Sequence, residues 1–474
     1  MKLFVSLILL GLFAGCKGTP TQGEKEARRQ VQAVVGSYRP DGHKPELPAL
    51  TSQSSLSNLL TYALLNQPQV EAAYFDWLAS VERITVARSL PDPQLTFQMD
   101  IQQVVTSLMP GLMMSFPGAG KLRAAAAVAA AESQAQYFAF RTASLQSAYA
   151  VEGAYYQLYF LQEKIRVNRE TLALLTDLAK LARAQNEVGK ATLQDVLRAQ
   201  ISQDRVETEI ANLEDSRAAL LARFKAALGL GADQPTPPVP QRLESTPLDV
   251  TSDKLLDQAL AQNTRLKGME ADVRTAEAAI AQAYKARMPD ASLGLMADVK
   301  MNPVVYRPWG TVSIPLWRDK LAAEVAQAQA NKRAGEARLS AEQIALAVAV
   351  AEKAFLYREA SRNLELLQNQ LLPRQRQSLE LARSGYLAGQ LDFLNLADTE
   401  QTLLRFGLDE VEARTQRELS RAELALIVQG LPASGAGMGP ITRPATAPSG
   451  GMGASGGGML PGGSSAPQKN KGGM

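Results

Sequence analysis

The feature that most limits how this chain can fold is an internal repeat of about 200 residues. Three landmarks occur twice in the same order, at offsets of 198, 199 and 200 residues. They are Leu90-Pro91-Asp92 with Met288-Pro289-Asp290, Gly120-Lys121-Leu122 with Asp319-Lys320-Leu321, and Gly189 with Gly389. Because chance matches would not keep one order and one spacing, we expect a tandem duplication. The first structural repeat is expected at 56–230, a Pro-rich linker at 231–250 and the second structural repeat at 251–430.

Each half predicts the same series of helices. A helical segment is expected at 56–89 and again at 255–287, and a very long helix is expected later in each half. In the first long helix the apolar positions step by three and four residues, which is typical of a coiled-coil seam with one polar break. The seam consists of Leu158, Leu161, Ile165, Asn168, Leu172, Leu175, Ala179 and Ala182. No proline interrupts 122–188, so this helix would be about 100 Å long.

Glycine turns are expected where the long helices reverse. Gly189 ends the first long helix, and Thr192 is placed to cap the returning one. The second half repeats this arrangement over 321–387, with a bend at Pro373 and a turn at Gly389. Each half therefore predicts one long helical hairpin.

Short strands are predicted between the helical segments. The first half has alternating apolar residues at Leu95, Phe97, Met99 and Ile101, a break at Pro110-Gly111, and a second run over 112–116. The second half alternates over 293–299 and, after Pro303, over 311–316. Such alternation is typical of transmembrane β-barrels, although a small soluble hairpin has the same pattern. The expected lipid-facing set is Leu95, Phe97, Val312, Ile314 and Leu316.

Four strands are too few to close a barrel. Even a narrow barrel takes about eight strands, and an open sheet edge is not tolerated in lipid. If these strands enter a membrane, several chains must share one barrel. Three chains would contribute twelve strands, although the sequence does not itself fix the number three.

The N-terminus has the pattern of a secretory signal. Lys2 precedes an apolar run over 3–13 that is too short to span a bilayer, and Ala14-Gly15-Cys16 follows. This resembles a bacterial lipoprotein signal, in which the cysteine is lipidated. We therefore expect a lipoprotein signal peptide at 1–15 and a lipid-anchored N-terminal segment at 16–55, beginning at Cys16. Lys17 is compatible with sorting to the outer membrane, and the alternative is a plain signal peptide with an incidental cysteine.

The composition excludes most catalytic chemistry. The chain has one cysteine and one histidine, so Ser-His-Asp triads, Cys-His dyads and Cys/His zinc sites would all depend on Cys16 or His43. Lys plus Arg is 50 against 47 for Asp plus Glu, which gives no electrostatic reason to expect nucleic acid. The segment Gly118–Lys121 lacks the first glycine and the final Ser or Thr of a phosphate loop. We expect no enzyme activity and no cofactor.

The duplication, the order of its elements and the lipoprotein start together resemble the TolC-like outer-membrane efflux channel family, most closely its heavy-metal efflux branch. The segments that carry the resemblance are 90–97, 116–122 and 372–389. It implies a mainly α fold with a small β part, in which duplicated long coiled-coil hairpins form an α-barrel that crosses the periplasm. It also implies a homotrimer whose chains each give four strands to a shared 12-stranded transmembrane β-barrel. The implied partners are a periplasmic adaptor (membrane fusion) protein, an inner-membrane pump and outer-membrane lipid.

The resemblance also assigns candidate residues. The adaptor-docking tips would be the turns at Gly189, Lys190, Gly389 and Gln390. The pore constriction would hold Asp195, Asn395 and Asp398. Family members place acidic residues at both of the last two positions, so Asn395 is a departure. Leu391 stands where a basic residue of the closed gate is often found. Asp195 and Asp398 would otherwise be ordinary exposed helix carboxylates.

The cargo is expected to be metal ions or small toxic compounds. Methionines are frequent in or beside the strands and in the tail, and thioethers suit Cu(I). The weak metal-binding candidates are Met438, Met452 and Met459, in a Gly/Met-rich tail at 431–474 that we expect to be disordered. Methionine also fills irregular packing, which is the simpler explanation.

The sequence therefore favours a passive exit duct across the periplasm and outer membrane, with energy supplied by a partner pump. The alternative is a lipid-anchored periplasmic coiled-coil scaffold protein without a pore, whose short strands pair in a soluble sheet. A periplasmic adaptor is disfavoured because it would lack the 200-residue repeat.

Overall fold

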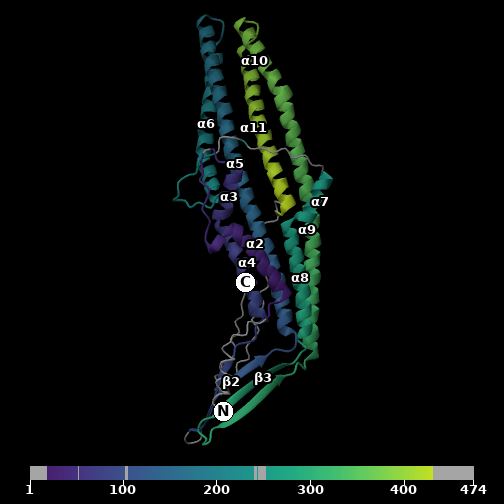
Figure 1. Cartoon of the computed structure of the whole chain (residues 1–474). Helices are drawn as coiled ribbons and strands as arrows, with labels where there is room; N and C mark the ends of the chain where they lie inside the picture. Colours follow the sequence, from purple (N-terminus) through teal and green to yellow (C-terminus); the bar gives the residue numbers. More distant parts are fainter. Residues whose placement is uncertain (1–18, 52, 102–104, 240–242, 244–251, 431–474) are drawn as a thin grey trace, which may run out of the picture. The chain divides into compact units, whose positions relative to one another are not determined.

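The computed structural model describes residues 19–51, 53–101, 105–239, 243 and 252–430. The predicted signal, Cys16, Met438, Met452 and Met459 lie outside these residues. The described chain is mostly helical with one small sheet (Figure 1). Its elements are α2 (Gln22–Tyr38), η1 (Pro40–Gly42), α3 (Leu56–Asn66), α4 (Pro68–Arg88), β1 (Gln94–Ile101), β2 (Val105–Phe116), α5 (Lys121–Glu187), α6 (Leu193–Ala227), α7 (Ser252–Gln262), α8 (Thr264–Lys285), β3 (Asp290–Asp298), β4 (Val305–Ser313), α9 (Arg318–Leu366), η2 (Leu367–Leu371), α10 (Leu372–Leu387) and α11 (Phe393–Gln429).

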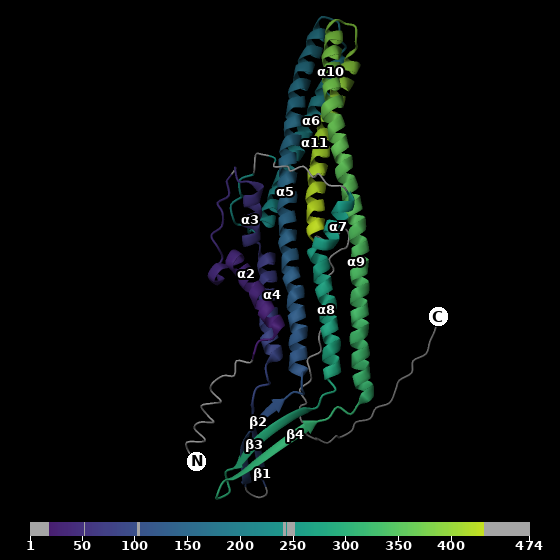
Figure 2. The same ribbon diagram turned by 45° about the vertical axis from the view of Figure 1, so that its right-hand side comes forward.

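The first long helix is confirmed. Helix α5 has 67 residues, which corresponds to about 100 Å. Leu158, Leu161 and Ile165 of its predicted seam are buried. Asn168, the polar break, is also buried, and its side-chain amide donates a hydrogen bond to the Lys164 carbonyl at 2.9 Å. Helices α6, α8 and α11 all run along parts of α5 (Figure 2).

The second long helix is interrupted just before Pro373. Helices α9 and α10 are joined by a π turn, η2 (Leu367–Leu371). Pro373 has no N–H to donate within the helix, and one wider turn adjusts the backbone ahead of it. The interruption expected at Pro373 is therefore present, as a π turn that ends two residues earlier.

The four strands form one antiparallel sheet in the order β1-β2-β3-β4. The central pair, β2 and β3, joins the two halves of the chain, with Ser115 opposite Ser292. Helix α5 begins immediately after β2, and its far end is the turn at Gly189. The sheet and the hairpin turns therefore lie at opposite ends of α5 (Figure 1).

The predicted break at Pro110-Gly111 is wrong, because β2 runs through both residues. Pro110 lies opposite Phe97 of β1, whereas the pairing with β3 starts one residue later, at Gly111 opposite Met296. The proline thus sits where the ladder to β3 ends, and a strand tolerates a missing N–H at such a point.

The last predicted strand is placed too late in the sequence. Strand β4 covers Val305–Ser313, so Val312 belongs to it but Ile314 and Leu316 do not. Pro315 follows directly and cannot donate to a ladder, which explains why the strand stops. Ile314 and Leu316 lie in the exposed connection to α9.

Helix α2 was not predicted, and a buried ion cluster holds it in place. Glu24 is 1% exposed. Its carboxylate accepts hydrogen bonds from Arg88 at 2.5 Å, Thr85 at 2.9 Å and Arg28 at 3.2 Å. Burial acts to raise the pKa of Glu24, but these hydrogen bonds outweigh it and the pKa is lowered. The cluster joins α2 to α4.

None of the helices in the described residues is both long enough and apolar enough to cross a membrane.

We predict that Glu24→Gln will detach α2 from α4. It should lower the free energy of α2 packing by about 3–5 kcal/mol, because it leaves Arg88 without its buried, charged partner. Differential hydrogen exchange of residues 22–38 measures the loss. The lowered pKa of Glu24 also predicts that α2 loses this stabilisation as the pH falls below 4.5. Glu82→Gln is the control, since Glu82 pairs with Arg28 at an exposed position. This substitution should lower the same free energy by less than about 1 kcal/mol. Equal effects of both substitutions would contradict the conclusion that the buried Glu24 cluster holds α2 to α4.

Candidate functional site

The first hairpin turn has the geometry that its glycine predicts. Gly189 has a φ of 72°, a left-handed conformation that L side chains rarely adopt. Its N–H donates to the Asn186 carbonyl at 2.9 Å, and the Lys190 N–H donates to the Gln185 carbonyl at 2.8 Å. These two bonds form a Schellman motif that ends α5.

The second turn repeats the first. Gly389 also has a φ of 72°. Its N–H donates to the Tyr386 carbonyl at 3.0 Å, and the Gln390 N–H donates to the Gly385 carbonyl at 2.8 Å. Gly189, Lys190, Gly389 and Gln390 are all exposed. The turns predicted at these glycines are therefore confirmed, and both are free to contact another molecule.

Matched caps start the returning helices. Thr192 and Asp195 form a capping box at the start of α6, where the Asp195 carboxylate accepts from the Thr192 N–H at 3.0 Å. Asp392 caps α11 by accepting from the Asn395 N–H at 3.0 Å. Asp195 and Asn395, two of the predicted constriction residues, thus also have a structural task at the helix starts.

A tip cluster of apolar side chains holds the two hairpins together near their turns. Its buried members are Leu178, Ala182, Val196, Ala199, Leu379, Ala382, Tyr386, Phe393 and Leu396, which come from α5, α6, α10 and α11. Burial raises the pKa of Tyr386, and the nearby charge of Asp195 raises it further. The structure therefore brings Asp195 of the first hairpin beside Tyr386 of the second.

The other two predicted constriction residues lie on a different surface. Asn395 and Asp398 are exposed on α11, on the side away from Phe393 and Leu396. The structure thus separates Asp195, at the contact between hairpins, from Asn395 and Asp398 on an open helix face.

Exposed apolar side chains surround both turns. Around the first they are Val188, Leu193 and Leu197, and around the second Leu387, Leu391 and Leu394. Leu391 folds back over Gly385, where an added Cβ would lie 2.7 Å from the leucine Cδ1. Apolar surface at the end of a hairpin is typical of a contact site for another protein.

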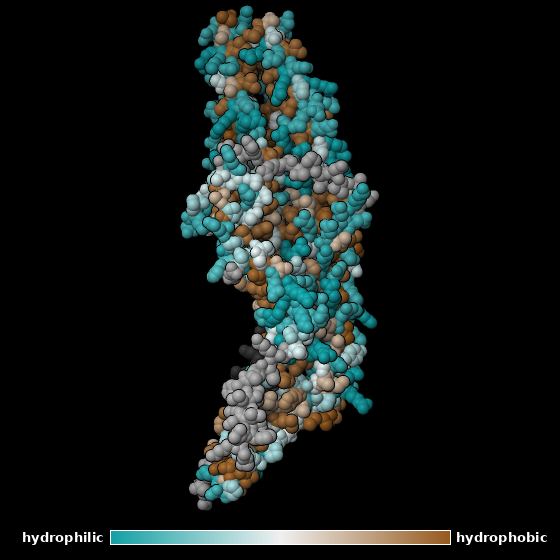
Figure 3. All heavy atoms as spheres, in the orientation of Figure 1, coloured by the Kyte–Doolittle hydropathy of each residue, from teal (hydrophilic) through white to brown (hydrophobic). Residues whose placement is uncertain are grey.

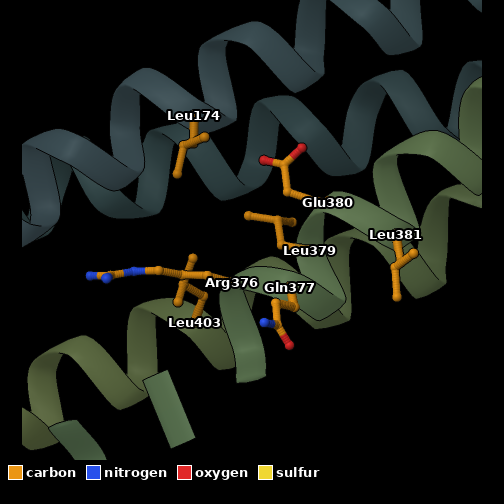
Figure 4. Close-up of a pocket in the computed structure, with 7 residues that line it drawn as sticks. All are labelled: Leu174, Arg376, Gln377, Leu379, Glu380, Leu381 and Leu403. Atoms are coloured by element: carbon orange, nitrogen blue, oxygen red, sulfur yellow. The ribbon is translucent and has the colours of Figure 1, made fainter. Parts of the chain in front are cut away.

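An open cleft of about 710 Å³ adjoins the tip cluster on the side away from the turns. It is lined by Leu174 of α5, Leu403 of α11 and a stretch of α10 that includes Arg376 and Glu380 (Figure 4). Leu379 belongs to both the cleft and the tip cluster. The cleft therefore lies between the two hairpins, with Leu174 on one side and the α10 and α11 residues on the other.

Glu400 was missed by the sequence analysis, because a single charged residue in a seam is easily assigned to the solvated face. It continues the spacing of Phe393, Leu396 and Leu403 on α11, and it is 2% exposed. Neither carboxylate oxygen accepts a hydrogen bond from any residue in the described ranges. Burial raises the pKa of Glu400 to about 7.

A second candidate surface is one face of the sheet. The strand registers place the following residues on it: Leu95, Phe97 and Met99 of β1, Leu108, Pro110, Leu112 and Met114 of β2, Leu293, Leu295 and Ala297 of β3, and Tyr306, Pro308, Gly310 and Val312 of β4. Phe97 is 68% exposed and Leu293 63%. Figure 3 shows apolar side chains gathered over the strands.

The opposite face of the sheet is polar or mixed. Ser115 and Ser292 approach within 3.2 Å across β2 and β3, and Ser107 donates to Asp298 at 3.1 Å. The methionines are divided between the faces, with Met109, Met113 and Met296 on this one. In the part of the chain that the structure describes, no group of three His, Cys, Asp or Glu residues could hold a metal ion.

We predict that Glu400→Gln will stabilise the tip cluster above pH 7. The unfolded chain releases the Glu400 proton near pH 4.5, whereas the folded chain keeps it to about pH 7. The free energy of unfolding should therefore fall by about 3 kcal/mol between these values in the native protein, and the amide should abolish that fall. Hydrogen exchange of 176–200 and 375–405 at pH 5 and pH 8 measures it.

The matched control for this prediction is Glu380→Gln, because Glu380 is an exposed carboxylate on the neighbouring helix. It should not change the pH dependence. A native pH profile that is flat from pH 5 to pH 8 would contradict the prediction.

Both halves of the chain match a known protein family. The family described as Outer membrane efflux protein matches residues 59–230 and 255–429. The outer membrane efflux protein BepC of Brucella suis biovar 1 (strain 1330) is 25% identical over 400 residues, which cover 80% of this chain and 83% of BepC.

Solved structures show the same fold. The outer membrane protein VceC of Vibrio cholerae has a TM-score of 0.66 at 17% identity, over 79% of this chain and 96% of VceC. The CmeC outer membrane channel of Campylobacter jejuni has a TM-score of 0.67 at 12% identity, over 84% of this chain and 92% of CmeC. Since the family match covers well over half of the sequence, the chain belongs to the outer membrane efflux protein family.

Proposed function

We propose that this protein is the outer-membrane exit duct of a tripartite efflux system. The observation that carries the proposal is the sheet, which has a continuous apolar face and a mixed opposite face that includes Gln94, Gln98 and Ser292. An exposed apolar face of this extent suits lipid, and a polar face suits a water-filled interior. A helix of about 100 Å that begins beside the same sheet suits a conduit through the periplasm.

The sheet also supports assembly from three chains. Strands β1 and β4 are the edges of a sheet of four, and an open edge in lipid leaves backbone groups without partners. A homotrimer would join these edges into a shared 12-stranded transmembrane β-barrel, with the helical hairpins continuing as an α-barrel. Cys16, lipidated after removal of 1–15, would add a lipid anchor.

The hairpin turns are the proposed docking site for a periplasmic adaptor that links the duct to an inner-membrane pump. Exposed apolar side chains at both turns support this role, because such surface is stabilised by contact with a partner. Asp195, Asn395 and Asp398 are the proposed constriction. The duct itself does no chemistry, and metal ions or small toxic compounds are the proposed cargo.

The scaffold alternative, a lipid-anchored coiled-coil protein without a pore, is less well supported. A soluble sheet would bury its apolar face against another layer. Phe97, Leu293 and Val312 instead remain more than half exposed among the described residues.

The proposal is tested first by native mass, measured on protein extracted in mild detergent from isolated outer membranes. We expect a species near three times the mass of one chain, found only in that fraction. Sensitivity of a deletion strain to metals and to small toxic compounds then tests the cargo. A monomer that is released by salt or by cleavage of the lipid anchor would overturn the duct and favour the scaffold.

Adjacent residues on β1 give a matched test of the apolar face. Phe97→Arg should block membrane assembly, because an arginine on a lipid-facing strand costs about 2–4 kcal/mol at the bilayer midplane. Gln98→Arg should assemble normally, because Gln98 lies on the opposite face. The measurement is the yield of heat-modifiable oligomer in the outer membrane. Normal assembly of both variants would count against lipid contact by this face.

A further inference from the structure

An ion pair closes the junction where β2 leaves the sheet and α5 begins. The Lys121 ammonium lies 2.8 Å from both carboxylate oxygens of Asp290, the first residue of β3. The Gly118 N–H also donates to Asp290, at 2.7 Å. This junction lies at the end of the strand pair in which Ser115 is opposite Ser292.

The repeat places a second aspartate and a second lysine, equivalent to Asp290 and Lys121, at the two edges of the sheet. Asp92, after Pro91, stands ahead of β1 as Asp290, after Pro289, stands at the start of β3. Lys320 stands after β4 as Lys121 stands after β2. Asp92 and Lys320 are not paired with each other within one chain, because β1 and β4 are not neighbours in the sheet.

Burial confirms that the two lysines occupy equivalent helical positions. Ala126 and Ala129 are the first buried residues of α5, at 0% and 5% exposure. Val325 and Ala328, 199 residues later, are the first buried residues of α9, at 7% and 9%. Lys320 therefore projects from α9 in the same direction as Lys121 projects from α5.

Asp92 and Lys320 are both exposed and can contact a second copy of the chain. Asp92 is exposed and forms no ion pair with any residue in the described ranges. The Lys320 side chain is 72% exposed, and its ion pair within α9 is with Glu324 at 3.8 Å. A carboxylate at one sheet edge and an ammonium at the other are complementary charges on surfaces that two copies would bring together.

We propose that Lys320 of one copy pairs with Asp92 of the next copy, and that β4 pairs with β1 of that copy with Ser313 opposite Gln94. The inference rests on the proposed shared assembly and specifies its subunit contact. The register follows from Ser115 and Ser292 by the repeat offset of 198.

The side-chain faces agree with this register. Ser313 and Gln94 both belong to the polar face, and the next pair, Val312 and Leu95, both belong to the apolar face. Phe97 would lie opposite Gly310, so an aromatic ring would cover a position without a side chain. A slip by one residue would put apolar side chains opposite polar ones.

The inter-copy junction is not identical to the one within the chain. Four residues separate Pro315 from Lys320, whereas three separate Pro117 from Lys121, and the four include no glycine. A Cβ at Gly118 would lie 2.6 Å from the Pro289 carbonyl oxygen, so Leu316 has no room for the backbone approach that Gly118 makes. The contact between copies is therefore carried by the Lys320 side chain and the strand register, without the third hydrogen bond.

Charge exchange tests the ion pair in full-length protein extracted in mild detergent. Asp92→Lys and Lys320→Asp should each lower the temperature at which the oligomer dissociates, and the double exchange should restore it. Arg318→Gln is a matched control in the first turn of α9 and should leave that temperature unchanged. Loss of stability in Arg318→Gln, or no recovery in the double exchange, would overturn the Lys320 assignment.

Cysteine pairs test the register. Val312→Cys with Leu95→Cys should give covalently linked oligomers after mild oxidation of isolated outer membranes, and Val312→Cys with Pro93→Cys should give far fewer. An oligomer of native mass that cross-links mainly through the second pair would overturn this register while leaving the duct intact. A monomer of native mass with no cross-linking in either pair would overturn the shared assembly itself.

Discussion

Backbone hydrogen bonding at the sheet edges is the constraint on which the rest of this architecture depends. Within the described residues β1 and β4 each pair on one side only. A sheet of four with one apolar face has no stable state alone in lipid, since its edge N–H and C=O groups would lack partners. In lipid, β1 and β4 would therefore need backbone partners, which other copies of the chain could supply. Joined copies would bring their α5 helices together, and helices of about 100 Å would then extend that assembly away from the membrane.

Duplication gives the chain similar residues at the β2–β3 contact and at its two free sheet edges. The β2–β3 contact joins the two halves within one chain, with Lys121 and Asp290 at its base. The same sequence parts recur at the free edges, so a contact that folds the chain can also join one chain to the next. The two turns show how closely the halves agree, because Gly189 and Gly389 have the same φ of 72° and the same pair of closing hydrogen bonds. A tube built from such chains would have two hairpins per copy, similar in their turns.

The long helices and their turns could be predicted because their signals are local and periodic. Seam residues such as Leu158 and Ile165 recur at fixed steps, and a glycine marks each reversal. Strand limits were less predictable, since β2 continues through Pro110 at the point where its regular pairing with β3 begins, and that pairing is a tertiary fact. Helix α2 and Glu400 were missed for a related reason. A carboxylate that is 1% or 2% exposed cannot be told from a surface carboxylate by sequence, because partners distant in the chain decide its burial.

Charge differences between the halves mean that the two hairpins of one chain are similar but not equivalent. Counting 200 residues along, Lys190 corresponds to Gln390, Arg198 to Asp398 and Gln200 to Glu400. Glu400 is the most consequential difference, because its buried carboxylate has no partner among the described residues, whereas an amide at the equivalent position carries no charge to desolvate. The second hairpin therefore carries a desolvation cost at Glu400 that the first hairpin does not carry at Gln200.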